Sequence, residues 1–138
     1  MICKKVNFIS YIGERDNFYS LIKKKLNINI SSDFLIKKNS PTILKKRYID
    51  RVSGTKLLGV YNTDSVYQDK KSEPYFFNKL KKISEKSDLL IISDYDHGLI
   101  SPKGANQISK LKNFVALNAQ VNASNYGYHT LSKYKKIN

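Results

Sequence analysis

Leu89-Leu90-Ile91-Ile92-Ser93-Asp94 and Phe114-Val115-Ala116-Leu117-Asn118 are the two stretches that decide the fold class. Each begins with a short apolar run of the kind that forms a strand buried inside a sheet. Between them, Ser101 is placed to cap a helix that Pro102 opens. A strand–helix–strand unit of this kind makes a right-handed crossover between parallel strands. The sequence therefore predicts an α/β fold, with a parallel sheet and flanking helices.

The residues before this unit predict further elements of the same kind. Val6 to Ile12 is an apolar run that stops at Gly13, as a buried strand ending in a turn does. Asp16 is placed to cap the helix that follows, whose apolar residues form one stripe. Phe34 to Ile36 is a short strand candidate, and Tyr75 to Lys86 has the apolar spacing of a second helix.

A β-hairpin is predicted between these elements, with strands at Thr42–Ile49 and Lys56–Tyr61 around the turn Ser53-Gly54-Thr55. It is expected to stand apart from the main sheet. An isolated two-stranded ribbon is marginal in water, and its exposed edges invite pairing with another chain. We therefore expect the hairpin to mediate self-association or to be mobile.

The charge of the chain is strongly positive, with 25 Lys and Arg against 11 Asp and Glu, a formal net charge of +14. Such a charge attracts polyanions without specificity. The basic residues are scattered in pairs and triples, and the abundance of Lys, Ile and Asn matches the codon bias of an AT-rich genome. No recognised nucleic-acid motif accompanies them. A basic nucleic-acid-binding module remains an alternative interpretation.

The cellular setting is constrained by the absence of two sequence features. Cys3 is the single cysteine, which excludes an internal disulfide and suits a reducing compartment. No run approaches the roughly 20 apolar residues that span a bilayer, so no membrane partner is predicted. The interpretation is a cytoplasmic protein.

The candidate binding residues follow the two strands named first. Asp94-Tyr95-Asp96-His97-Gly98 comes after one, and Asn118-Ala119-Gln120-Val121-Asn122 after the other. Ligands of open α/β sheets bind beyond the carboxyl ends of the strands, so these acids and amides predict a polar ligand. The alternative is that Asp94 and Asn118 only cap loops. His97 and His129 lack partners at metal-binding spacing, and no metal site is predicted.

One resemblance at this position is to haloacid-dehalogenase-type phosphatases. Ile91-Ile92-Ser93-Asp94-Tyr95-Asp96 is similar to their first motif, an apolar strand followed by Asp-x-Asp. That resemblance implies Asp94 as nucleophile and Asp96 as proton shuttle. It departs at His97-Gly98, and no lysine or second acidic pair is expected downstream to complete the site.

The wider resemblance is to ribokinase-like (PfkB) carbohydrate kinases, specifically a heptose-phosphate-kinase-like branch often fused to a cytidylyltransferase-type domain. It runs over nearly the whole chain in four ordered segments: Gly13-x-x-Asp16, Pro41-Thr42-Ile43-Leu44-Lys45-Lys46-Arg47-Tyr48, Ser93-Asp94-Tyr95-x-x-Gly98, and Phe114 to Gly127 with its Asn118-Ala119-Gln120-Val121-Asn122 core. The resemblance implies that residues 1–138 are the central part of a kinase domain, with a lid hairpin at about residues 34–61.

The resemblance also implies a function in nucleotide-sugar biosynthesis, as an ATP- and Mg²⁺-dependent kinase of a phosphosugar. Its substrate-binding residues would be Thr42, Lys45 and Arg47 on the lid, and Asp94, Tyr95, Gly98, Asn118, Gln120 and Asn122 at the strand ends. The family's Asp-Thr-x-Gly-Ala-Gly-Asp-like motif, which carries the catalytic base and an anion hole, has no counterpart here. We therefore expect a fragment that is inactive alone and pairs with itself or with a missing C-terminal half.

Overall fold

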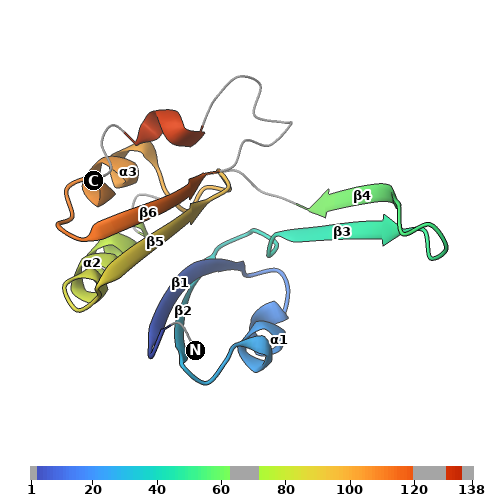
Figure 1. Cartoon of the computed structure of the whole chain (residues 1–138), viewed down its shortest axis with the longest axis horizontal. Coiled ribbons are helices and arrows are strands. Elements are labelled where there is room, and N and C mark those ends of the chain that lie inside the picture. Colours follow the sequence, from blue (N-terminus) through green and yellow to red (C-terminus); the bar gives the residue numbers. More distant parts are fainter. Residues whose placement is uncertain (1–2, 63–71, 120–129, 135–138) are drawn as a thin grey trace. The chain divides into compact units, whose positions relative to one another are not determined.

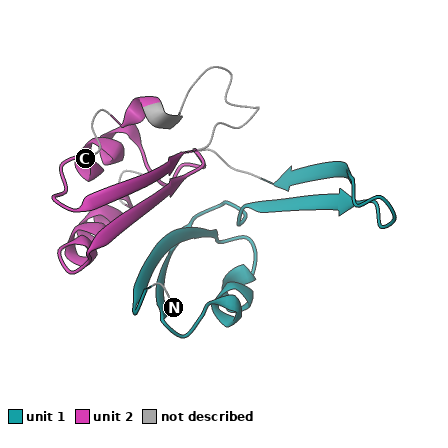
Figure 2. Cartoon of the chain, viewed as in Figure 1, with its two compact units in different colours: residues 1–64 teal, residues 65–138 magenta. Residues whose placement is uncertain are grey.

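The computed structural model describes residues 3–62, 72–119 and 130–134, except for the side chains of residues 130 and 131. The chain divides into two compact units, residues 1–64 and residues 65–138 (Figure 2). The first unit contains β1, α1, β2, β3 and β4, and the second contains α2, β5, α3, β6 and the short 3₁₀ helix η1 (Figure 1).

The first unit opens with a β–α–β crossover. Strands β1 (Val6–Gly13) and β2 (Ile30–Lys37) pair in parallel, with Val6 opposite Ile30 and Gly13 opposite Lys37. Helix α1 (Phe18–Lys25) connects them. The rings of Phe8 and Tyr19 both pack edge-on against Phe34, with centroids 5.9 and 5.8 Å away, which fastens the helix to one face of the strand pair. The predicted strand at Phe34–Ile36 is confirmed and is longer than expected.

The cap predicted for α1 is wrong. The residue before the helix is Asn17, whose side chain makes no capping hydrogen bond. The carboxylate of Asp16, one residue earlier, accepts hydrogen bonds chiefly from Thr42, far along the chain. Thr42 provides two donors, its hydroxyl and its backbone N–H, one for each oxygen of the Asp16 carboxylate.

The predicted hairpin is confirmed as an antiparallel pair of its own, β3 (Leu44–Ile49) and β4 (Lys56–Asn62). Asp50 fixes its turn by accepting hydrogen bonds from the N–H and hydroxyl of Ser53. The lid predicted at about residues 34–61 stays a prediction, and within that range the first hairpin strand begins at Leu44. Residues up to Lys37 belong to β2, because they complete the parallel ladder with β1.

The second unit is built on the crossover predicted from the sequence. Strands β5 (Leu89–Asp94) and β6 (Phe114–Ala119) pair in parallel, and α3 (Pro102–Ile108) connects them. The hydroxyl of Ser101 accepts a hydrogen bond from the Gly104 N–H at 3.0 Å and Pro102 opens the helix, which confirms the predicted cap. Helix α2 (Ser72–Ser84) precedes β5, and η1 (Thr130–Lys133) follows β6.

The core of this unit lies between the helices and one face of β5–β6. Its buried apolar residues come from every layer: Phe76, Leu80, Ile92, Ile100, Ala105, Ile108 and Val115. Helices α2 and α3 meet closely at Gly104, because a β-carbon there would lie 2.3 Å from the Phe77 ring. The opposite face of the strand pair is exposed, with Ile91 and Phe114 more than half accessible.

The structure is thus a mixed α/β fold, as predicted. Its described strands form three separate pairs, two parallel and one antiparallel. A continuous sheet of the ribokinase type stays a prediction. Among the helices that the structure describes, none has the length and apolar character needed to cross a membrane.

Candidate functional site

The carboxyl end of β1 is fastened to the base of the hairpin by a polar network that we call the clasp, residues 13–16 and 37–42. The hydroxyl of Thr42 accepts a hydrogen bond from the Gly13 N–H at 2.9 Å and donates one to Asp16 Oδ1 at 2.6 Å. The Thr42 N–H donates to Asp16 Oδ2 at 2.5 Å. Two segments that the sequence offered as separate motifs therefore meet in one place.

Backbone contacts complete the clasp. The Glu14 N–H donates to the Lys37 carbonyl and the Arg15 N–H to the Ser40 carbonyl, each at 3.1 Å. Gly13 is required because a β-carbon there would lie 2.1 Å from the carbonyl carbon of Pro41. No rotation of a side chain relieves an overlap with backbone.

The clasp also fixes the charge of Asp16. The hydrogen bond from the Thr42 hydroxyl, followed by those from the backbone N–H groups of Thr42 and Phe18, holds the pKa of this carboxyl below its ordinary value. The half-buried Asp16 carboxylate is therefore an anion at neutral pH. Thr42 was predicted to contact substrate, but its hydroxyl donates its proton to Asp16 in the structure.

Lys45 and Arg47, the other predicted lid residues, lie on one face of the exposed hairpin. Lys45 pairs with Tyr61 across the strands, and Arg47 pairs with Gly59. The Lys56 ammonium reaches the same place and donates to the Tyr61 hydroxyl at 3.3 Å. We call Lys45, Arg47, Lys56 and Tyr61 the cationic face of the hairpin.

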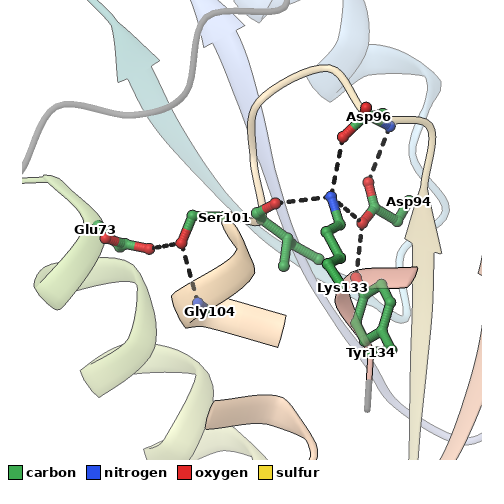
Figure 3. A network of polar contacts seen from close by, with 8 residues as sticks. Glu73, Asp94, Asp96, Ser101, Gly104, Lys133 and Tyr134 are labelled. Atoms are coloured by element: carbon green, nitrogen blue, oxygen red, sulfur yellow. Dashed lines mark hydrogen bonds and ion pairs between the residues drawn. The ribbon is translucent and has the colours of Figure 1, made fainter. Parts of the chain in front are cut away.

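The end of β5 carries a second polar network, centred on Asp94 (Figure 3). The Lys133 ammonium lies 2.8 Å from Asp94 Oδ2 and 3.1 Å from Asp96 Oδ1, and it donates to the Ile100 carbonyl at 2.9 Å. The Tyr134 hydroxyl donates to Asp94 Oδ2 at 2.7 Å. Asp94 is 4% exposed and Lys133 8%, so this ion pair is shielded from water.

The loop after Asp94 folds back onto the same carboxylate. The Asp96 N–H donates to Asp94 Oδ1 at 3.0 Å. Both Asp96 and Gly98 have left-handed backbone, with φ of 57° and 84°. Burial, the hydrogen bond to Asp94 and the negative charges of Asp94 and Asp96 all raise the pKa of Tyr134, which therefore stays protonated and keeps donating.

The remaining predicted site residues divide into two groups. Tyr95 and Gly98 lie in the Asp94 loop, where the Tyr95 ring stacks on His97 with centroids 6.5 Å apart. Asn118 pairs with Ser93, whereas Asp94 pairs with Ala119. Successive strand residues point to opposite faces, so the structure does not bring the Asp94 and Asn118 side chains together. Gln120 and Asn122 lie outside the described residues.

Sequence reasoning missed Lys133, and the expectation that no lysine downstream would join Asp94 and Asp96 is wrong. Tyr134, Lys56 and Tyr61 were missed as well. Tyr61 had a usable signal, since the antiparallel register places it opposite Lys45 on the same face. Lys56 had none, because it joins this face only through the irregular register between Tyr48 and Ile49. Lys133 had none, because many lysines follow Asp94 and only the folded chain selects one.

The described residues do not fit a bound Mg²⁺. They contain no group of three His, Cys, Asp or Glu side chains close enough to hold a metal ion. Asp94 and Asp96 share the ammonium of Lys133, which occupies the position where a cation would neutralise them.

No protein-family model matches the chain, and no curated protein matches it. The geometry and the sequence motifs therefore carry the functional argument.

Proposed function

We propose that this chain is the substrate-side half of a cytoplasmic, ATP-dependent carbohydrate kinase of the ribokinase-like type, acting on a phosphosugar. Thr42, Lys45 and Arg47 belong to its lid, and Asp94, Tyr95, Gly98, Asn118, Gln120 and Asn122 are its proposed strand-end contacts. ATP and Mg²⁺ belong to the complete reaction, and the described residues offer Mg²⁺ no fitting site.

The observation that carries this proposal is the clasp. Parallel strands β1 and β2 end at the same edge, at Gly13 and Lys37. The hairpin leaves that edge and is tied to it through Thr42, Gly13 and Asp16. Because open α/β sheets bind ligands beyond the carboxyl ends of their strands, a hairpin anchored there is placed to cover a ligand, as a lid does.

The Asp94 network supports a binding loop at the second strand end. Lys133 and Tyr134 fix the carboxylate of Asp94, and Asp94 fixes the loop through the Asp96 N–H. A loop held this way presents Tyr95 and Gly98 in one geometry, as a binding site requires. The role we propose for Asp94 is to shape this loop for contact with the sugar.

The test is a titration of the isotope-labelled chain with sugars, followed by NMR. Hexose and heptose phosphates should shift the amide signals of the clasp and of the Asp94 loop, and they should bind more tightly than inorganic phosphate. Equal affinity for inorganic phosphate and for every sugar phosphate would contradict a sugar site.

A second candidate, a phosphatase that uses Asp94 as nucleophile, is favoured by one observation, the position of Lys133 beside Asp94 and Asp96. We expect no turnover of an aryl phosphate with Mg²⁺, because both oxygens of the buried Asp94 carboxylate are already engaged. Measurable hydrolysis that disappears in Asp94→Asn would show that the phosphatase interpretation is right.

A further inference from the structure

The hairpin gathers positive charge on one face. The Lys45 and Lys56 ammonium groups lie 5.9 and 5.8 Å from the centre of the Tyr61 ring. Lys56 also donates to the Tyr61 hydroxyl at 3.3 Å. Arg47 lies two residues from Lys45 on the same strand, and hence on the same face. The hydrogen bond from Lys56, then the charge of Lys56 and that of Arg47, hold the pKa of the Tyr61 hydroxyl below its ordinary value.

Gly59 provides the space in which these groups meet. Gly59 is directly opposite Arg47 in the strand pair. The φ angle of Gly59 does not lie in the left-handed region. Its backbone therefore does not require glycine. A β-carbon there would lie 2.8 Å from the Tyr61 hydroxyl and 3.1 Å from Lys56 Cε. A glycine inside a strand often marks the close approach of another group. Here the missing side chain of Gly59 leaves room for the side chains of Tyr61 and Lys56 to meet above it.

The hairpin itself contributes one acidic residue, Asp50, which is at the turn and accepts hydrogen bonds from Ser53. The positive groups of the cationic face lie close together, and a phosphate bound there would interact favourably with each of them. An Arg guanidinium, two ammonium groups and a phenol together match the several acceptor oxygens of a phosphoryl group.

We propose that the cationic face, Lys45, Arg47, Lys56 and Tyr61, binds the phosphate group of a small phosphate monoester. Arg47 and the two lysines supply charge-assisted hydrogen bonds, and Tyr61 donates its hydroxyl proton to the ligand. This site deepens the proposed function and rests on it for the hairpin's role as a lid. The same chemistry would accept inorganic phosphate, a sugar phosphate or a mononucleotide.

The chain offers matched controls for this site. Lys46 lies on the same strand as Lys45 and is paired with Val60, which places it on the opposite face. Arg51 is exposed at the turn of the same hairpin. Lys46→Ala and Arg51→Ala therefore remove the same charges from the same element without touching the cationic face. Gly59→Ala removes no charge and displaces Tyr61 and Lys56.

The experiment measures affinity for inorganic phosphate, glucose 6-phosphate and adenosine monophosphate by NMR titration. Arg47→Ala and Lys56→Ala should each weaken binding of all three about tenfold, and Gly59→Ala should weaken it as well. Lys46→Ala and Arg51→Ala should leave it unchanged. Equal losses in the control variants would overturn the proposal, because binding would then follow net charge alone.

Two further outcomes separate this site from the kinase proposal. If monoesters bind the cationic face but no sugar adds affinity beyond inorganic phosphate, the phosphate site stands and the sugar kinase fails. If sugars bind at the clasp or the Asp94 loop without shifting hairpin signals, the kinase proposal stands and the phosphate site fails. The proposal of a phosphate-monoester site would also be overturned if a single-stranded oligonucleotide bound the hairpin far more tightly than any monoester.

Discussion

Thr42 and Asp94 illustrate how single side chains organise this protein. Each is a polar group at the end of a parallel strand pair, and each is satisfied by partners distant in sequence. Such residues carry a large part of the local stability, because removing one leaves its partners buried and unpaired.

Thr42→Val should destabilise the chain while preserving the shape of the side chain. The Gly13 N–H loses its acceptor, which costs on the order of 1 kcal/mol, and Asp16 loses its hydroxyl donor. The free energy of unfolding in urea measures the effect. Thr42→Ser keeps the hydroxyl and should retain most of the stability. A valine variant as stable as the serine variant would show that the clasp does not depend on the hydroxyl.

The clasp should also weaken in acid. Asp16 has a pKa lowered below its ordinary 3.8 in the folded state, chiefly by the Thr42 hydroxyl. The unfolded chain therefore takes up the proton first, and the stabilisation is present above pH 3.8 and is lost as the pH falls through the folded pKa. Urea unfolding between pH 5 and pH 2 should show this loss, and Thr42→Val should show a smaller one. Equal pH dependence in both proteins would contradict the assignment.

The Asp94–Lys133 pair should behave as a coupled buried pair. Lys133→Met leaves Asp94 and Asp96 without their shared cation and should cost about 3 kcal/mol or more. Asp94→Asn combined with Lys133→Met should cost less than the sum of the two single changes. Should Lys133→Met fail to fold, Tyr134→Phe provides a milder probe, with an expected loss of about 1 kcal/mol. Strict additivity in unfolding measurements would show that the pair is not coupled.

At the scale of elements, glycines decide how closely segments approach. Gly13 admits the backbone of residues 40–42 to the end of β1, and Gly104 admits Phe77 to helix α3. Sequence alone did not indicate either role, because a glycine that serves packing is indistinguishable in sequence from one that serves a turn.

Gly104→Ala should destabilise the second unit. Its β-carbon would lie 2.3 Å from Phe77 Cζ and 2.7 Å from Cε2, so the ring must move. Overpacking of this kind costs about 1–3 kcal/mol, which exceeds the gain of up to ~1 kcal/mol from the helix propensity of alanine. Thermal unfolding should show a lower midpoint, and Phe77→Leu should restore part of it. Gln107→Ala, exposed on the same helix, is the control.

For the whole molecule, the sequence predicted what depends on local pattern. The strands, the hairpin and the Ser101–Pro102 helix start follow from apolar periodicity, turn residues and capping. The predicted extent of β2 was too short, and the predicted role of Asp16 as a helix cap was wrong. Both features are set by contacts between residues far apart in the sequence. Within the candidate site, Gly13, Asp16 and Thr42 were named from separate motifs, and only the structure joined them.

The charge of the whole chain bears on the alternative of a nucleic-acid-binding module. A net charge of +14 is enough for non-specific attraction to polyanions. Such binding falls steeply with salt, because it is driven by counterion release. A phosphate site on the hairpin differs in that it depends on particular side chains.

Our central proposal is that this chain supplies the substrate side of a sugar kinase. The most direct measurement is ATP-dependent phosphorylation of a phosphosugar by the chain alone and after addition of the C-terminal half of a ribokinase-like kinase. We predict no turnover alone, activity in the mixture, and loss of that activity with Arg47→Ala but not with Arg51→Ala. Robust kinase activity from these 138 residues alone would contradict the account.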